Sequence, residues 1–316
     1  MLWDKTFDYR TFPLLHGGRF ITESGIYALD TCEPVLWVNP LTGEEEHWQW
    51  RRMYGCNYPI ASEHLLTFRS GAAGYYDLAG QSGTGNFGGF KSGCTSNLVC
   101  ADGVLNAPDY TRTCSCSYQN QTSLALVHMP DVEMWTFNDF TVDERPIKRL
   151  GLNLGAPGDR RASNGTLWIE YPVGQSPSPD VQVAVAPDNT AWRLHHSSRF
   201  AGELPWVAAS CGEGIASVTL ALAPKAEQTR PYTVRLVFAE PETIGPGTRV
   251  FDVALQGKNV AENLDIVREA GAPRTSVIRE FNGVLAKDSL VVTLSPSDSS
   301  AMPPVLSGVE AVLEEE

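Results

Sequence analysis

Residues 231–240 read PYTVRLVFAE, and this stretch decides the fold of the second half of the chain. Its apolar residues recur with an approximate period of two, which is typical of a β-strand that buries one face. Similar runs follow at 249–255 (RVFDVAL), 290–294 (LVVTL) and 305–313 (VLSGVEAVL), and turn-forming Gly, Pro, Asn and Asp separate them. Short strands between such turns, without a sustained helical period, predict an antiparallel β-sandwich.

Length and composition set the outer bounds. A chain of 316 residues has room for two domains of ordinary size, and 42% hydrophobic residues suffice for packed cores. A formal net charge of −13 argues against nucleic acid as a partner, because phosphate binding needs a basic surface. No apolar run is long enough to predict a membrane span, and no signal peptide is visible after MLWDK at the start.

The first third of the chain carries a repeated strand and turn rhythm. LLHGGRFI and GIYALD at 14–30 are partly repeated by LLTFRSG and GYYDL at 65–78, and more loosely by LVCADGVL at 98–105. This rhythm resembles the PQQ-like β-propeller repeat, in particular the last blades of large bacterial propellers. The resemblance implies propeller blades over residues 1–137.

A propeller needs about four to eight four-stranded blades to close its ring, at roughly 40–50 residues each. Residues 1–137 hold at most three such repeats. We therefore expect an incomplete propeller, in the C-terminal part of a larger protein, whose missing N-terminal blades come from elsewhere.

The second half of the chain has a separate resemblance. FAE at 238–240, RVFDV at 249–253 and LDI at 264–266 resemble the malectin-like domain, and GLNLG at 151–155 and GTLW at 165–168 match its beginning. That family is a jelly-roll type β-sandwich related to carbohydrate-binding modules. The resemblance implies an all-β chain in which a malectin-like sandwich over residues 138–316 follows the blades and binds carbohydrate.

Sugar recognition needs flat rings against the apolar sugar face, with polar groups on the hydroxyls. The candidate ligand-binding residues of the second domain are Trp168, Tyr171, Trp192 and Trp206. Burial in the sandwich core is the alternative for each ring, and it applies most to Trp168 because that residue lies in an evident strand. The loop at 241–247 lacks the aromatic residues that sugar-binding relatives place there. The alternative that this module does not bind sugar therefore stays open.

No catalytic constellation is visible. The sequence has no G-x-S-x-G nucleophile elbow and no Cys-x-x-Cys-His haem motif. The glycines at 83–89 lack the Lys-Ser/Thr of a phosphate loop. Glu240 and Asp252 fit a structural role, in which they cap loops through backbone hydrogen bonds. No cofactor is predicted.

Seven cysteines are a further signal. We predict disulfides among Cys56, Cys94, Cys114 and Cys116, as in exported proteins, with buried free thiols as the alternative. A zinc site is a weaker hypothesis, because paired Cys-x-x-Cys knuckles are absent from the sequence. No metal ligands are therefore assigned.

The leading hypothesis is a non-catalytic carbohydrate-binding or scaffolding protein, the C-terminal part of a larger exported propeller protein. It would be periplasmic, on the cell surface or secreted. Two alternatives stay open: an accessory or targeting region of a larger propeller enzyme, and a protein-interaction platform without sugar binding.

Overall fold

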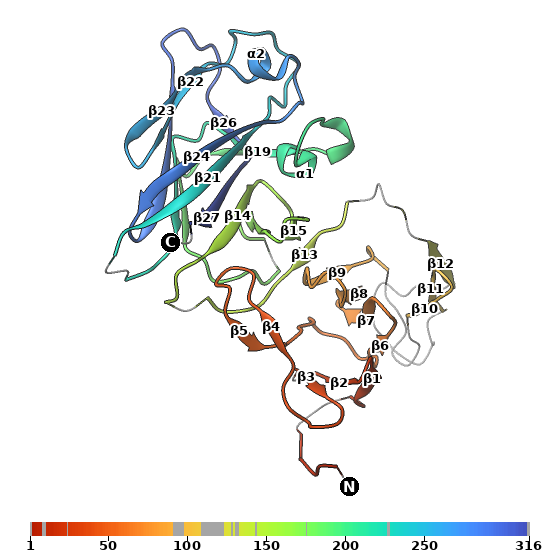
Figure 1. Ribbon diagram of the computed structural model, residues 1–316. Coiled ribbons are helices and arrows are strands. Elements are labelled where there is room, and N and C mark those ends of the chain that lie inside the picture. Colours follow the sequence, from red (N-terminus) through yellow and green to blue (C-terminus); the bar gives the residue numbers. More distant parts are fainter. Residues whose placement is uncertain are drawn as a thin grey trace. The chain divides into compact units, whose positions relative to one another are not determined.

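The computed structural model describes residues 2–7, 11–23, 25–90, 98–108, 123–127, 129, 133–142, 144–174, 176–225 and 228–314. The fold is nearly all-β, as predicted, and it contains two compact units (Figure 1). The first unit comprises Met1–Asn39 and Glu44–Asn138, and the second comprises Pro40–Gly43 and Asp139–Glu316. None of the helices in the described ranges has the length and apolar character needed to span a membrane.

The first unit consists of short antiparallel strands. Its largest sheet has the order β13-β9-β8-β7-β6, with bounds Thr136–Phe137, Thr84–Asn86, Ala72–Asp77, Leu65–Ser70 and Ile60–Ala61. Two three-stranded meanders and one hairpin accompany it: β1 (Leu14–His16), β2 (Arg19–Thr22) and β3 (Gly25–Ala28); β10 (Val99–Ala101), β11 (Val104–Ala107) and β12 (Leu124–Val127); β4 (Leu36–Val38) and β5 (Glu45–His47).

Within the sheets of this unit, paired strands are consecutive in the chain except β13, which pairs with β9. In the β7–β8 hairpin Ser70 pairs with Ala72, and Gly71 between them has φ +71°, a conformation that favours glycine. The described sheets have three, five, three and two strands, so they differ from the uniform four-stranded blades of a regular propeller. The propeller interpretation stays a prediction.

The second unit is a β-sandwich. Its six-stranded sheet has the order β15-β16-β14-β27-β21-β24, with bounds Arg160–Arg161, Leu167–Tyr171, Arg149–Leu154, Gly308–Leu313, Arg230–Phe238 and Val277–Ala286. The five-stranded sheet has the order β17-β20-β25-β22-β23, with bounds Val183–Ala186, Ser217–Ala221, Ser289–Pro296, Phe251–Leu255 and Lys258–Leu264. All neighbouring strands in both sheets are antiparallel except β14 and β16, which are parallel.

Smaller elements complete this unit. A three-stranded sheet has the order β18 (Ala191–Leu194), β19 (Ser210–Glu213) and β26 (Val305–Leu306). The helical elements are short: η1 (Ser197–Arg199), α1 (Pro205–Ala208) and α2 (Ile266–Ala270).

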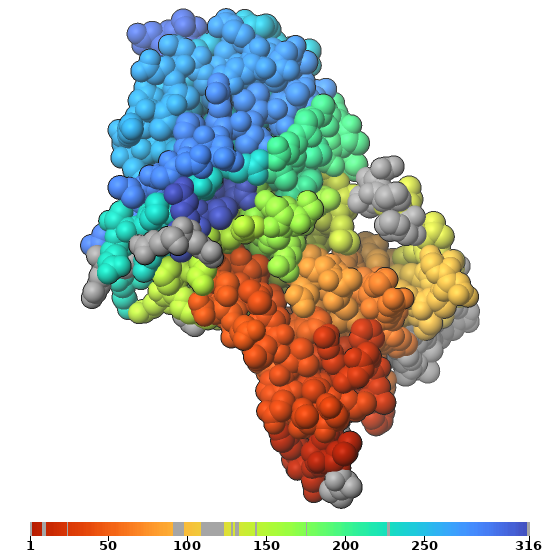
Figure 2. All heavy atoms as spheres, in the orientation of Figure 1, coloured from red at the N-terminus to blue at the C-terminus, as the bar shows by residue number. Residues whose placement is uncertain are grey.

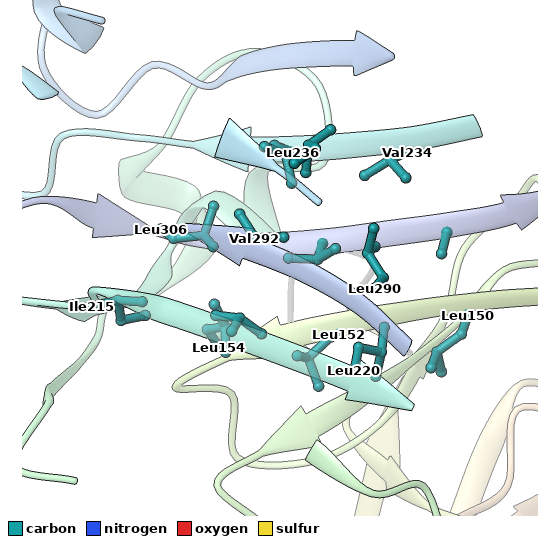
Figure 3. Packing of buried hydrophobic residues seen from close by; sticks show 14 of the residues in the cluster. Leu150, Leu152, Leu154, Ile215, Leu220, Val234, Leu236, Leu290, Val292 and Leu306 are labelled. Carbon is teal, nitrogen blue, oxygen red and sulfur yellow. The ribbon is translucent and has the colours of Figure 1, made fainter. Parts of the chain in front are cut away.

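The core of the second unit lies between the two large sheets. Leu150, Leu152 and Leu154 of β14 alternate with residues of the outer face, and their side chains point toward Leu220 and Val292 of the opposite sheet (Figure 3). The alternation puts every second side chain of a strand on the same face.

Residues 40–43 belong to the second unit although they lie far from it in the sequence. Leu41 has 0% exposure and is part of the core between the sheets. Its carbonyl oxygen accepts hydrogen bonds from the backbone nitrogens of Lys148 (2.7 Å) and Arg149 (3.1 Å). The start of β14 is therefore fixed by a segment about a hundred residues earlier in the chain.

Candidate ligand-binding site

Trp168 is fully buried on the outer face of the six-stranded sheet, with 0% exposure. Its ring lies over two glycines of neighbouring strands: a Cβ atom at Gly151 would lie 2.2 Å from Cδ2 of Trp168, and one at Gly308 would lie 2.7 Å from Cζ3. Because glycine has no side chain, Gly151 and Gly308 leave the space that the Trp168 ring fills. Trp168 has no face open to a ligand.

Trp206, on α1, is also covered, with 8% exposure. Its ring meets that of Trp168 edge-on, at 5.9 Å between centroids and 85° between planes. The Arg160 guanidinium carbon lies 4.9 Å from the Trp206 ring centroid, an arrangement that adds a cation–π attraction. The segment that carries α1 lies at the surface of the second unit (green in Figure 2), but the indole itself packs inward.

Tyr171 and Trp192 form a second aromatic pair, and both rings are half-buried. Tyr171 ends β16 and Trp192 lies in β18, so the fold brings together two strands of different sheets. The ring centroids are 5.6 Å apart and the planes meet at 73°, which is the favoured edge-to-face geometry. Each ring packs on the core with one part and reaches solvent with another. Of the four predicted aromatic residues, these two are the ones with surface left for a ligand.

A chain of ion pairs starts at Arg193, which follows Trp192 in β18 and faces the opposite side of that strand. Arg193 Nη2 lies 2.9 Å from Glu213 Oε2, and Arg249 Nη2 lies 3.1 Å from Glu213 Oε1. Arg249 Nε then lies 2.7 Å from Glu240 Oε2. The side chain of Arg193 is 47% exposed, whereas those of Arg249 and Glu240 are 1% and 0% exposed. The chain thus connects a solvent-exposed guanidinium to a buried carboxylate.

The electrostatics keep this chain charged. Burial acts to raise the pKa of Glu213, but the hydrogen bonds and charges of Arg193 and Arg249 together outweigh it and hold the pKa below its ordinary value. The hydrogen bond to Glu213 in turn raises the pKa of Arg193. Nearby, burial raises the pKa of the Cys211 thiol to about 12, so this thiol stays protonated and unreactive.

The sequence did not point to this ion-pair chain. Its members come from β18, β19 and the two ends of the loop between β21 and β22. No local spacing connects them, since strand pairing alone brings Arg193 opposite Cys211 and next to Glu213. A signal was present only in Arg193 itself, which follows a predicted ligand-binding tryptophan.

Glu240 and Asp252 both accept backbone hydrogen bonds, as predicted, but only Glu240 lies in a loop, since Asp252 is part of β22 and its partner Asn263 is part of β23. Glu240 Oε1 accepts a hydrogen bond from the Glu242 backbone nitrogen at 3.0 Å, and Asp252 Oδ1 accepts one from Asn263 at 2.7 Å. Asp265 caps α2, because its Oδ1 accepts from the Arg268 nitrogen at 3.1 Å. Glu240 and Asp265 thus hold loops in place, whereas Asp252 joins the neighbouring strands β22 and β23.

The predicted disulfide at Cys56 is not observed: Cys56 is free and exposed. Its sulfur lies 3.3 Å from the Tyr54 hydroxyl oxygen instead of another sulfur. Cys94, Cys114 and Cys116 lie outside the described residues. In the part of the chain that the structure describes, no group of three or more His, Cys, Asp and Glu residues is placed to hold a metal ion.

Comparisons with known proteins find one family and several distant structural neighbours. A family model described as Malectin domain matches residues 221–300. A comparison with curated protein sequences finds no match. Among solved structures, the ANXUR2 extracellular domain from Arabidopsis thaliana is 18% identical, with a TM-score of 0.39, over 53% of this chain and 42% of that one.

The plant receptor-like kinase FER gives 16% identity and a TM-score of 0.39, again over 53% and 42% of the two chains. The Bacteroides uniformis β-glucuronidase gives 11% identity and a TM-score of 0.43, over 84% of this chain and 29% of that chain. The chain therefore spans less than half the length of these proteins. What the comparisons identify in this chain is similarity to the Malectin domain over residues 221–300, which hold β21 to β25 and α2.

Proposed function

We propose that the second unit is a malectin-like, non-catalytic binding module that holds a saccharide at Tyr171 and Trp192. The observation that carries this proposal is the half-exposed ring pair of Tyr171 and Trp192. A ring offers its apolar face to the C–H face of a sugar.

The non-catalytic part of the proposal rests on the occupied carboxylates. Glu240 and Asp252 each accept a backbone hydrogen bond, and Glu240 also pairs with Arg249. A general acid or base must be free to exchange a proton with a substrate. These groups are committed to hydrogen bonds and an ion pair within the fold instead.

We further propose that residues 1–137 are PQQ-like propeller blades and residues 138–316 the malectin-like sandwich of a larger exported protein. The antiparallel meanders of the first unit support the blades. The module would then act in the periplasm, at the cell surface or outside the cell. The two alternative functions differ in their use of the site. An accessory or targeting region of a propeller enzyme would bind its ligand at the same site, whereas a protein-interaction platform would not bind sugar there.

Calorimetric titration of the full chain against glucans and neutral oligosaccharides tests the saccharide site. Replacing Trp192 with alanine should weaken binding by about 5- to 150-fold, because a stacked ring contributes about 1–3 kcal/mol. Trp37, a half-buried tryptophan of the first unit, provides the matched control, and Trp37→Ala should leave affinity unchanged. Binding should also be nearly independent of salt, because a neutral sugar carries no charge to screen.

A flat response across the panel, with circular dichroism showing a folded protein, would refute saccharide binding and favour the interaction platform. Equal losses in Trp192→Ala and Trp37→Ala would place the site elsewhere.

A further inference from the structure

Three neighbouring strands of the six-stranded sheet bring an Asn-Gly pair against a carboxylate. Asn282 and Gly283 are consecutive residues of β24, and both are exposed. Thr233 lies in β21, which pairs with β24 on one side and with β27 on the other (Figure 1). Glu314 directly follows β27. Three separate segments of the chain therefore supply the four residues.

The hydrogen bonds among these residues are short and converge on one carboxylate oxygen. The Gly283 nitrogen donates to Glu314 Oε1 at 2.7 Å. The Thr233 hydroxyl oxygen lies 2.9 Å from the same Glu314 oxygen and 3.0 Å from Asn282 Oδ1. The Asn282 side-chain amide and the Gly283 backbone nitrogen are thus each one hydrogen bond away from the pair of Thr233 and Glu314.

The strand pairing is irregular at this point, which explains why a side chain can reach the Gly283 nitrogen. The register between β21 and β24 shifts between Tyr232 and Val234, and it skips Asn282 and Gly283. Gly283 has φ +64°, a left-handed conformation that favours glycine and is typical of β-bulges. A Cβ atom at this position would meet nothing within 4 Å, so open space surrounds it.

We propose that Asn282 is a site of self-modification, at which asparagine loses ammonia and becomes aspartate or isoaspartate through a succinimide ring. The Gly283 nitrogen attacks Cγ of Asn282, and the Glu314 carboxylate takes the proton of that nitrogen. The single proton of the Thr233 hydroxyl then turns from Glu314 to Asn282 Oδ1, where negative charge develops.

The second half of the reaction releases the side-chain nitrogen of Asn282. The Cγ–Nδ2 bond breaks, the Cγ–Oδ1 double bond forms again, and Nδ2 leaves as ammonia with the proton that Glu314 had taken. Water then opens the succinimide ring. Attack on one ring carbonyl gives aspartate, and attack on the other gives isoaspartate. Both residues of the ring are exposed, so water reaches it.

The geometry meets the requirement for a general base. Such a group must lie within about 2.6–3.2 Å of the atom whose proton it takes, and Glu314 Oε1 lies 2.7 Å from the Gly283 nitrogen. The nucleophile and the amide that it attacks belong to adjacent residues, so no second molecule has to be bound and oriented. Only water enters from outside.

The sequence holds a second Asn-Gly pair, Asn164 and Gly165, which lacks this arrangement. The Gly165 nitrogen donates to the Ala162 carbonyl oxygen at 2.9 Å, and a backbone carbonyl accepts a hydrogen bond without taking the proton. The Asn164 amide is held by two other contacts: Oδ1 accepts from the Thr166 nitrogen at 3.1 Å, and Nδ2 donates to Glu310 Oε1 at 3.3 Å. The two pairs share a motif, but only Asn282 has a base on the following nitrogen.

The modification goes beyond the proposed saccharide function and does not depend on it. Aspartate at position 282 adds a negative charge next to Glu314, and like charges that face each other on a sheet are destabilising. Isoaspartate also lengthens the β24 backbone by one carbon atom. Both products should weaken the pairing of β24 with β21.

Incubation of the full chain at about pH 7, followed by peptide mapping with mass spectrometry, tests the proposal. Asn282 should convert at least about tenfold faster than Asn164 in the same sample, because a positioned general base acts on only one of them. Free hydroxide is the base available to Asn164. Lowering the pH from about 8 to about 6 should therefore slow Asn164 far more than Asn282.

Substitutions at Glu314 separate a general base from a structural contact. Glu314→Gln keeps a hydrogen-bond acceptor for Gly283 but removes the base, so conversion of Asn282 should slow about tenfold or more while that of Asn164 stays unchanged. Glu314→Asp retains a carboxylate and should convert faster than Glu314→Gln. A purely structural role predicts the opposite for Glu314→Gln, since a loosened bulge lets the Asn282 amide approach the Gly283 nitrogen more often.

Thr233→Val removes the hydroxyl that donates to Asn282 Oδ1 and should also slow conversion of Asn282 by about tenfold or more. No conversion of Asn282, or equal conversion of Asn282 and Asn164, would overturn the proposal. Unchanged or faster conversion of Asn282 in Glu314→Gln would overturn it as well, because Glu314 would then hold the bulge without acting as a base.

Discussion

Replacing Gly151 with alanine should destabilise the second unit by about 1–3 kcal/mol, the usual cost of overpacking. The new Cβ atom would lie 2.2, 2.5 and 2.6 Å from Cδ2, Cγ and Cε2 of Trp168, well inside contact distance. The indole has little room to withdraw, because it is fully buried and meets Gly308 and the Trp206 ring on its other sides. Where no such obstacle exists, alanine in a strand is more stable than glycine by about 0.5–1 kcal/mol.

Native-state hydrogen exchange followed by mass spectrometry measures this effect on the peptide that contains β14, without requiring the whole chain to unfold in one step. Gly245→Ala is the control: a Cβ there meets nothing within 4 Å, so the change should stay below about 0.5 kcal/mol. In a Trp168→Leu background the cost of Gly151→Ala should fall below about 1 kcal/mol, since the clashing ring is gone. An unchanged cost in that background, or none in the wild type, would refute the packing argument.

Three further predictions concern the same unit. Leu41→Ala should destabilise β14 by about 2–5 kcal/mol, because it leaves a cavity between the sheets; normal exchange protection of the β14 peptide would contradict this. The pKa of Glu213 is lowered in the folded state, so its stabilisation is present above its unfolded pKa of about 4.3 and is lost as the pH falls further. On acidification from about pH 5 to pH 3, the Tm of Glu213→Gln should therefore fall less than the Tm of the wild type. An equal fall in both proteins would contradict this role of the Glu213 carboxylate. Burial raises the pKa of Glu170, despite a hydrogen bond from the Gly174 nitrogen, so the stability it contributes below about pH 4.3 is lost as the pH rises. Glu170→Gln should accordingly raise Tm at pH 7 but not at pH 4, and equal Tm shifts at both values would argue against burial of the charge as the cause.

The strands of the sandwich were predictable because their signal is local. The alternation in 231–240 predicts a buried face that consists of Tyr232, Val234, Leu236 and Phe238. All four belong to β21 and lie in the core of the second unit. The run at 290–294 became β25, and the run at 305–313 became β26 and β27, which are separated at Ser307. Side chains on a strand point alternately to opposite faces, so the sequence of a single strand specifies which residues must be covered.

The candidate site was predictable only in part, because burial of a ring depends on distant segments. The sequence singled out four aromatic residues, but it could not show that Gly151 and Gly308 leave space for Trp168 to lie flat and covered. Nor could it show that Tyr171 and Trp192 meet while keeping exposed surface.

By itself, the sequence determined that this chain is nearly all-β, that its second half folds as a sandwich, and which strand faces form the core. Only the tertiary structure decided that Leu41 completes that core, that Arg193, Glu213 and Arg249 form one chain of charges, and that the Nε2 atom of His195 is buried without a hydrogen-bond partner among the described residues. The physical reason is the range of the interactions. Alternation acts between residues two positions apart, whereas packing and ion pairing join segments whose separation in the sequence carries no pattern.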